Sequence, residues 1–222
     1  MTDPSVPTHA AVVPNGPGRL AGAALASVRA ADLVIAADGG ARRLLGLGIA
    51  PHYLVGDLDS LPLETVARLV SAGCQLQRHP ADKDATDTEL AIALALDQGA
   101  TDIDLVGATG GARLDHSLAN VLLLAADWPA SVRLRLVEPT ATALVVRAGQ
   151  SVDVPGAVGA IVALLPLAGP ARGITTRGLQ YALAGEDLAF GRARGVSNVM
   201  TAPVASISLA AGILLVIHQH PD

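Results

Sequence analysis

The hydrophobic pattern of this 222-residue chain changes period near residue 130. Before that point, short apolar runs alternate with longer stretches of helical period, which is typical of a parallel sheet with helices on both faces. After it, no long stretch has helical period, and short β-rich pieces separated by Gly and Pro predict an antiparallel sandwich or barrel. We therefore expect an α/β domain over residues 1–130 and an all-β domain over residues 131–222.

The expected elements place the polar motifs of the first part at one edge of the sheet. Ligands of open parallel sheets bind beyond the carboxyl ends of the strands, so the residues after each strand are the candidates for chemistry. The strands are expected at 9–13, 32–37, 53–55, 74–77 and 103–106, and the helices at 20–30, 41–47, 63–72, 86–98 and 114–126. In the second part, β pieces are expected at 132–137, 143–146, 160–165, 173–176, 204–209 and 213–218.

Composition excludes several classes of protein. With 51% hydrophobic and 16% charged residues the chain can bury a real core, so disorder is not expected. An aromatic content of 2% and a net charge of -5 argue against nucleic-acid binding. The apolar stretch 204–217 is too short to span a membrane, and residues 1–7 lack the pattern of a signal peptide. Cys74 is the only cysteine, so we expect a soluble cytoplasmic protein without membrane or nucleic-acid partners.

The first acidic motif is Asp57-x-Asp59, directly after the 53–55 strand. Mg²⁺ binds oxygen ligands and usually takes one or two carboxylates, with its other positions left to water and phosphate oxygens. Two aspartates on one turn suit that ion. The alternative is a structural turn in which Asp59 or Ser60 caps the helix that follows.

The second motif surrounds Lys83, the only lysine, within the acidic run 82–89. Thr86 and Glu89 have the spacing of a capping box, and Asp87 falls in the first turn of the helix, where its dipole favours an anion. Acids crowded around one ammonium repel one another unless a cation compensates them. A metal ligand at Asp87 and a phosphate contact from Lys83 account for the cluster better than capping alone.

The third motif is a glycine-rich turn, 107–111, followed by Arg113 and Asp115. Backbone N–H groups of such a turn can cradle phosphate oxygens, although it matches neither a Walker A loop nor a dinucleotide fingerprint. The planar fork of Arg113 suits phosphate. The alternatives are a surface ion pair between Arg113 and Asp115 or a helix cap at Asp115.

Taken together and in order, these motifs resemble the thiamine pyrophosphokinase (thiamine diphosphokinase) family. The resemblance covers roughly residues 9–217. It is carried by the segments 38–40 (DGG), 56–60 (GDLDS), 83–89 (KDATDTE), 110–120 (GGARLDHSLAN), 177–183 (RGLQYAL) and 194–198 (RGVSN).

The resemblance implies a Rossmann-like α/β domain that binds nucleotide and Mg²⁺, followed by a β-sandwich that binds thiamine and forms the dimer. The site of this homodimer would lie at the subunit interface. It implies transfer of the diphosphoryl group of ATP to the hydroxyl of thiamine, which releases AMP. The implied Mg²⁺ ligands are Asp57, Asp59 and Asp87. The implied ATP contacts are Lys83, Asp84, Thr86, Gly110 and Arg113, with Asp115 at the phosphates or the reacting alcohol. The implied thiamine contacts are Ser197 and Asn198 of the partner subunit, and Tyr181, which could instead fill the sandwich core.

Several alternatives stay open at this point. Either Asp87 or Asp115 could take the proton of the attacking alcohol. The acceptor could be another alcohol, such as a hydroxymethyl-pterin, because the catalytic half would look similar. A phosphohydrolase with Asp57 as nucleophile would leave the Lys83 and Arg113 clusters unexplained, and a non-catalytic sensor of nucleotide or thiamine diphosphate would not need the intact set of acids.

Overall fold

The computed structural model describes residues 8–220. The chain divides into two compact units, the first made of Met1–Leu123 and Asp127–Pro139 and the second of Leu124–Ala126 and Thr140–Asp222. The expectation about a signal peptide in residues 1–7 lies outside the described residues. Among the helices that are described, none combines the length and the apolar character needed to cross a membrane.

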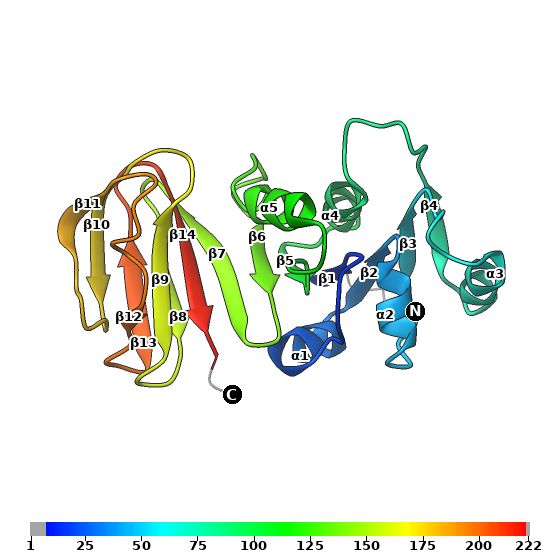
Figure 1. The fold of residues 1–222 in the computed structure, drawn as a ribbon, viewed down its shortest axis with the longest axis horizontal. Helices are drawn as coiled ribbons and strands as arrows, with labels where there is room; N and C mark the ends of the chain where they lie inside the picture. The colour runs from blue at the N-terminus through cyan, green and yellow to red at the C-terminus, as the bar shows by residue number, and fades with distance from the viewer. Residues whose placement is uncertain (1–7, 221–222) are drawn as a thin grey trace, which may run out of the picture. The chain divides into compact units, whose positions relative to one another are not determined.

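The first unit contains a parallel sheet with the strand order β6-β5-β1-β2-β3-β4 (Figure 1). Every neighbouring pair in this order is parallel. The strands are β1 (His9–Val13), β2 (Leu33–Ala37), β3 (Tyr53–Gly56), β4 (Gln75–Arg78), β5 (Asp102–Val106) and β6 (Arg133–Val137). The central strands are buried almost throughout, as expected for a parallel sheet covered on both faces.

Helices cover both faces of this sheet, which confirms the predicted α/β class. Helices α1, α2 and α3 bury their apolar residues in one cluster with β1, β2 and β3, whereas α4 and α5 lie on the opposite face from α1 and α2 (Figure 1). The bounds are α1 (Gly22–Ala30), α2 (Gly40–Leu45), α3 (Leu63–Ser71), α4 (Asp87–Asp97) and α5 (Leu114–Leu123).

Strand β6 corrects one expectation. The sequence pattern assigned residues 132–137 to the antiparallel part, but Arg133–Val137 pairs in parallel with β5 and belongs to the first unit. The register sets Asp102 opposite Arg133 and Asp104 opposite Arg135. Ion pairs between these neighbours favour the parallel pairing, and a pattern read within one short strand could not reveal them.

The second unit is a sandwich of two antiparallel sheets, as predicted. One sheet has the order β12-β9-β14-β7 and the other the order β11-β10-β13-β8. Apolar residues from both sheets form its core. The bounds are β7 (Ala141–Arg147), β8 (Ser151–Pro155), β9 (Ile161–Pro166), β10 (Ala171–Arg177), β11 (Ala184–Leu188), β12 (Asn198–Val199), β13 (Val204–Ser208) and β14 (Ile213–Gln219).

The strand order places a crevice in the first unit. From β1 the chain proceeds to β2, β3 and β4 on one side, whereas β5 and β6 lie on the other side. The loops that leave the carboxyl ends of β1 and β5 therefore run in opposite directions and open a gap between them. Such a switch point is where open α/β sheets bind their ligands.

Candidate functional site

A cavity of about 310 Å³ occupies this switch point. Its walls come from the loop after β1, the end of β2, the start of α4, and the loop after β5 together with the first turns of α5. Backbone of a glycine-rich turn and the N-terminal ends of two helices thus face one space, a combination that suits an anionic ligand. The lining residues are Pro14, Asn15, Gly16, Pro17, Ala37, Asp38, Thr86, Asp87, Thr88, Ala108, Gly110, Gly111, Ala112, Arg113, His116, Ser117 and Asn120.

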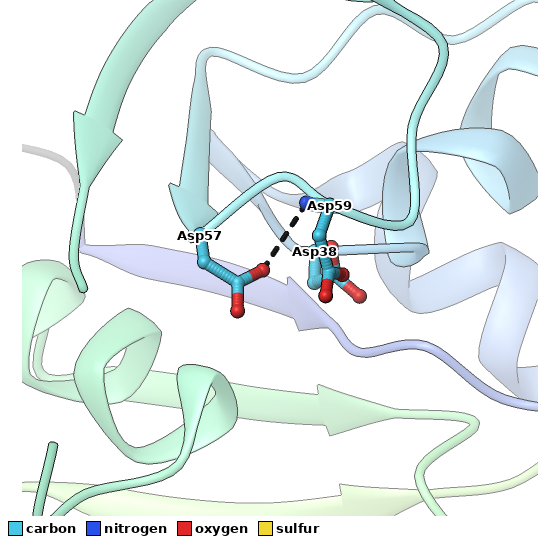
Figure 2. A group of neighbouring side chains, drawn as sticks. All are labelled: Asp38, Asp57 and Asp59. Atoms are coloured by element: carbon cyan, nitrogen blue, oxygen red, sulfur yellow. Dashed lines mark hydrogen bonds between the residues drawn. The ribbon is translucent and has the colours of Figure 1, made fainter. Parts of the chain in front are cut away.

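Three carboxylates meet at the carboxyl ends of β2 and β3. Asp38, Asp57 and Asp59 each offer an oxygen that lies within 4.8 Å of the others, and Figure 2 shows the three side chains next to one another. Asp57 Oδ1 accepts a hydrogen bond from the Asp59 backbone N–H at 3.2 Å, and Asp38 Oδ1 accepts one from the Ser60 hydroxyl at 2.7 Å. The predicted convergence of Asp57 and Asp59 is therefore present, with Asp38 as a third member.

The turn between the two aspartates explains why both point outward. Leu58 is buried in the core cluster under the helices, which leaves its two neighbours on the opposite side of the chain. Leu58 and Asp38 both have positive φ angles, 65° and 46°, a conformation that costs non-glycine residues energy and is concentrated at functional sites. Helix α3 begins after Pro62 without a side-chain cap, so the alternative in which Asp59 or Ser60 caps it is wrong.

The electrostatics of the cluster favour a bound cation. The carboxylate of Asp57 raises the pKa of Asp59 above its ordinary value, and loss of solvent and the charges of Asp38 and Asp87 act in the same direction. Within the described residues, none of Asp38, Asp57 and Asp59 forms an ion pair. Hard oxygen donors and uncompensated negative charge fit the requirements of Mg²⁺.

Asp87 lies beside this cluster but is held by Lys83. Gly56 lies between Asp87 and Asp38. A Cβ atom added to this glycine would be 3.1 Å from Asp87 Cγ and 3.4 Å from Asp38 Cβ. Lys83 Nζ is 3.0 Å from Asp87 Oδ1 and donates to the Pro80 carbonyl at 3.0 Å. The ammonium contact lacks hydrogen-bond alignment, since the buried Oδ1 has no hydrogen-bond partner among the described residues. Asp87 as a metal ligand stays a prediction.

The rest of the second motif is only partly structural. Thr86 caps α4, and its hydroxyl accepts the Glu89 backbone N–H at 3.2 Å, as the capping-box spacing predicted. Thr86 also lines the cavity, whereas Asp84 is exposed and does not line it. Of the three residues in this motif that were predicted to contact the nucleotide, Thr86 therefore lines the cavity, whereas Lys83 and Asp84 do not.

Arg113 and Asp115 form the surface ion pair that the sequence left open as an alternative. Two hydrogen bonds join them, Nε to Oδ1 at 2.9 Å and Nη2 to Oδ2 at 2.6 Å, and their side chains are 68% and 63% exposed. The bond from Arg113 holds the pKa of Asp115 well below its usual range, which makes this carboxylate a poor proton acceptor. Arg113 and Gly110 line the cavity, but Asp115 does not.

The three residues predicted to bind thiamine lie close together in the second unit without sharing one cavity. Ser197 lines a cavity of about 770 Å³, and Tyr181 and Asn198 line another of about 410 Å³. The Asn198 amide is buried; it donates to the Tyr181 carbonyl at 2.8 Å and accepts the Tyr181 N–H at 2.9 Å. Asn198 therefore fixes the backbone of Tyr181, whose side chain is 64% exposed.

Sequence reasoning places Asp38 at the same rim as Asp57 and Asp59 but did not name it as a candidate metal ligand. Asp38 follows β2 as Asp57 follows β3, and its position after an apolar strand was the available signal. Since β2 and β3 are parallel neighbours, residues that follow their ends meet at the same edge.

Comparison with known proteins agrees with this geometry. Sequence models of thiamin pyrophosphokinase match residues 25–136 (catalytic domain) and residues 150–214 (vitamin B1 binding domain). Thiamine pyrophosphokinase of Bacillus subtilis (strain 168) is 29% identical over 187 residues, which cover 84% of this chain and 87% of that protein.

Solved structures show the same likeness. The crystal structure of thiamine pyrophosphokinase from Bacillus subtilis has a TM-score of 0.84 and 25% identity, with 97% of this chain and 100% of that chain covered. The one from Geobacillus thermodenitrificans has a TM-score of 0.81 and 30% identity, with 97% and 99% covered. With both domain models matched in order and the fold shared over 97% of its length, the chain belongs to the thiamin pyrophosphokinase family.

Proposed function

We propose that this protein is a Mg²⁺-dependent thiamine diphosphokinase, which transfers the diphosphoryl group of ATP to the hydroxyl of thiamine and forms thiamine diphosphate and AMP. The observation that carries the proposal is the cluster of Asp38, Asp57 and Asp59 at the edge of a cavity lined by a glycine-rich turn and two helix starts. Carboxylates that lack a cation of their own, beside a site that suits phosphate, are the arrangement that phosphoryl transfer needs.

The residues of the first unit have distinct roles in this proposal. Asp57 and Asp59, with Asp38, would hold Mg²⁺, and Asp87 would complete the set when Lys83 turns to a phosphate. The ion would supply charge neutralisation at the phosphate oxygens. Thr86, Gly110 and Arg113 line the cavity and would bind the phosphates of ATP, with Arg113 exchanging its bond to Asp115 for one to phosphate.

Of the two candidate acceptors for the proton of the attacking alcohol, Asp87 is the better placed, because Asp115 does not line the cavity. Asp87 borders the cavity, and its Oδ1 has no hydrogen bond within the described residues. In-line attack would otherwise depend on positioning, because phosphoryl transfer needs little covalent help from the protein.

Thiamine would bind through Ser197 and through the ring and backbone of Tyr181. Asn198 fixes that backbone with two hydrogen bonds.

We also propose a homodimer. Leu114, Leu118 and Leu122 follow one another at intervals of four along α5 and are 69%, 56% and 56% exposed. An apolar stripe on a helix indicates a surface that a partner covers, and sedimentation of Leu118→Glu against the parent chain tests it through loss of the dimer. A cytoplasmic location stays a prediction that the single Cys74 supports.

The decisive experiment measures AMP and diphosphorylated product with ATP, MgCl₂ and a panel of acceptor alcohols. AMP formed in equal amount to thiamine diphosphate, and only when thiamine is present, is the expected result. Formation with a hydroxymethyl-pterin alone would select the other diphosphokinase. Phosphate release with transient labelling of Asp57 would indicate a phosphohydrolase, and tight binding without turnover would indicate a sensor.

A further inference from the structure

The side chain of Arg43 joins the two loops that bound the cavity. Arg43 lies on α2, and its Nη1 donates to the Pro14 carbonyl at 3.0 Å and to the Gly107 carbonyl at 2.7 Å. Pro14 follows β1 and Gly107 follows β5, so a single nitrogen bridges the loops on the two sides of the switch point. Arg43 itself does not line the cavity.

Both loops are shaped to fit this guanidinium. A Cβ atom on Gly16 would lie 2.9 Å from Arg43 Nη1, and one on Gly107 would overlap Nη2. Gly107 also has a φ angle of 59°, which disfavours other residues. Each loop thus carries a glycine where the guanidinium packs, which an arginine pointing into solvent would not require.

The Arg43 guanidinium is a partly buried positive charge in contact with both loops. Burial lowers the pKa of Arg43, while the charge of Glu138 opposes that effect. Its Nε is buried and has no hydrogen-bond partner among the described residues. Burying part of a cation costs free energy of folding. Its role in shaping the loops for a ligand would account for that cost.

The loop after β5 is held at four consecutive residues. Besides the bond from Arg43 to Gly107, the Asn120 amide donates to the Ala108 carbonyl at 2.8 Å. Thr109 N–H donates to Glu138 at 2.9 Å, and Gly110 N–H donates to the Ser117 hydroxyl at 3.0 Å. Of these contacts, the one from Arg43 is the one that also reaches the β1 loop.

We propose that Arg43 is a positioning residue for nucleotide binding: it sets the separation of the β1 and β5 loops, so that their backbone groups are already in place for a polyphosphate. The inference rests on the proposed function, since it takes the cavity as the nucleotide site. Preorganised loops bind more tightly because they lose less conformational freedom on binding. Arg43 acts through the loops and touches no substrate.

The test uses the full chain and calorimetric binding of α,β-methylene-ATP with MgCl₂, a probe that does not turn over. Arg43→Ala should weaken binding about 10- to 100-fold, the range for groups that orient direct ligands. Arg43→Lys should also lose affinity despite its positive charge, because an ammonium cannot reproduce the planar bridge. Methylguanidinium should restore part of the affinity of Arg43→Ala.

Arg42→Ala is the matched control, since Arg42 is the exposed neighbour on the same helix and should bind like the parent chain. Hydrogen exchange gives a second measurement: in Arg43→Lys, residues 14–17 and 107–110 should lose protection while residues 140–220 keep theirs. If Arg43→Ala does not fold, hydrogen exchange and analogue binding of Arg43→Lys test the role of Arg43 instead.

The outcomes separate the inference from the proposed function. A parent chain that binds the analogue but forms no AMP with thiamine, with Arg43→Lys impaired in binding, would defeat the function and support the inference. Unchanged analogue affinity and unchanged loop protection in Arg43→Lys would overturn the inference, even in an active enzyme. A parent chain that does not bind the analogue would overturn both.

Discussion

Two groups of aspartates lie at opposite ends of the parallel sheet and differ in how their charge is compensated. At the amino end, Asp104 is 2% exposed and accepts bonds from Arg135 at 2.8 Å and Ser27 at 2.6 Å, and it lies 3.0 Å from His9 Nε2. Asp102 is paired with Arg133 and Arg135. At the carboxyl end, the cluster of Asp38, Asp57 and Asp59 forms no ion pair within the described residues.

The difference in charge compensation distinguishes acids that stabilise the fold from acids that are candidates for binding a ligand. A buried carboxylate that is fully paired stabilises the fold, because removing it would leave several hydrogen-bonding and charged groups without a partner. In the cluster at the carboxyl end, Asp57 raises the pKa of Asp59 and no ion pair from the described part of the chain compensates the charge, which works against the fold; groups of this kind are typical of binding sites. The same residue type on one sheet is thus fully paired at one end and, among residues 8–220, without an ion pair at the other, which supports the ligand role proposed for the carboxyl-end cluster.

The largest expected effect is on the stability of the amino end. Asp104→Ala would leave Arg135, Ser27 and His9 without their shared acceptor, so we expect a loss of about 3–5 kcal/mol in the free energy of unfolding. Urea denaturation measures it, with the exposed Glu64→Ala as the control. A loss below about 1 kcal/mol would place Asp104 among ordinary surface pairs.

The next effect is on activity at the carboxyl end. Asp57→Asn should reduce AMP formation about 100- to 1,000-fold, the range for removing one group that stabilises charge in a transition state. Stability in EDTA should not fall, because the substitution relieves repulsion with Asp59. Near-normal kinetics at saturating Mg²⁺ would contradict the assignment of Asp57 as a ligand.

A smaller effect should appear when Mg²⁺ is added to the chain without nucleotide. Binding to the folded state alone at 100 times Kd would raise the free energy of unfolding by about 2.7 kcal/mol. Asp38→Asn should lose most of that increment, whereas Asp104→Asn should keep it. Equal stabilisation by NaCl at the same ionic strength would show that screening, and not a bound ion, is responsible.

The smallest expected effect is the loss of the Asp102 contribution to stability at acidic pH. Burial raises the pKa of Asp102, but the hydrogen bond from Arg133 and the charges of Arg135 and Arg133 outweigh it, so its pKa lies below the ordinary value. A depressed pKa contributes stability above the unfolded pKa, near 3.9, and that stability is lost as pH falls through the folded pKa. The stability gap between the parent chain and Asp102→Asn should therefore be constant from about pH 7 to 5 and close below about pH 4. A gap that persists to pH 2 would contradict this pairing.

Much of the fold was predictable because its signals are local. The β1 and β2 strands are apolar runs, and Thr86 with Glu89 announces the start of α4. Strands β8, β11 and β12 were not predicted, since segments such as AGEDL at β11 lack apolar alternation and are held by pairing with β10. Likewise Asp57 and Asp59 were found from one motif, but Asp38 joins them only through the parallel pairing of β2 and β3.

The amino-acid sequence by itself determined the two classes of architecture, the polar residues that follow the strands, and the family resemblance. These properties depend on hydrophobic period and on short motifs, which act between residues close in the chain. Only the tertiary structure decided that Asp38 completes the acid cluster, that Arg133 and Arg135 neutralise β5, and that Arg43 bridges two loops. Each of these depends on contacts between residues far apart in sequence, and those contacts exist only once the strand order is set.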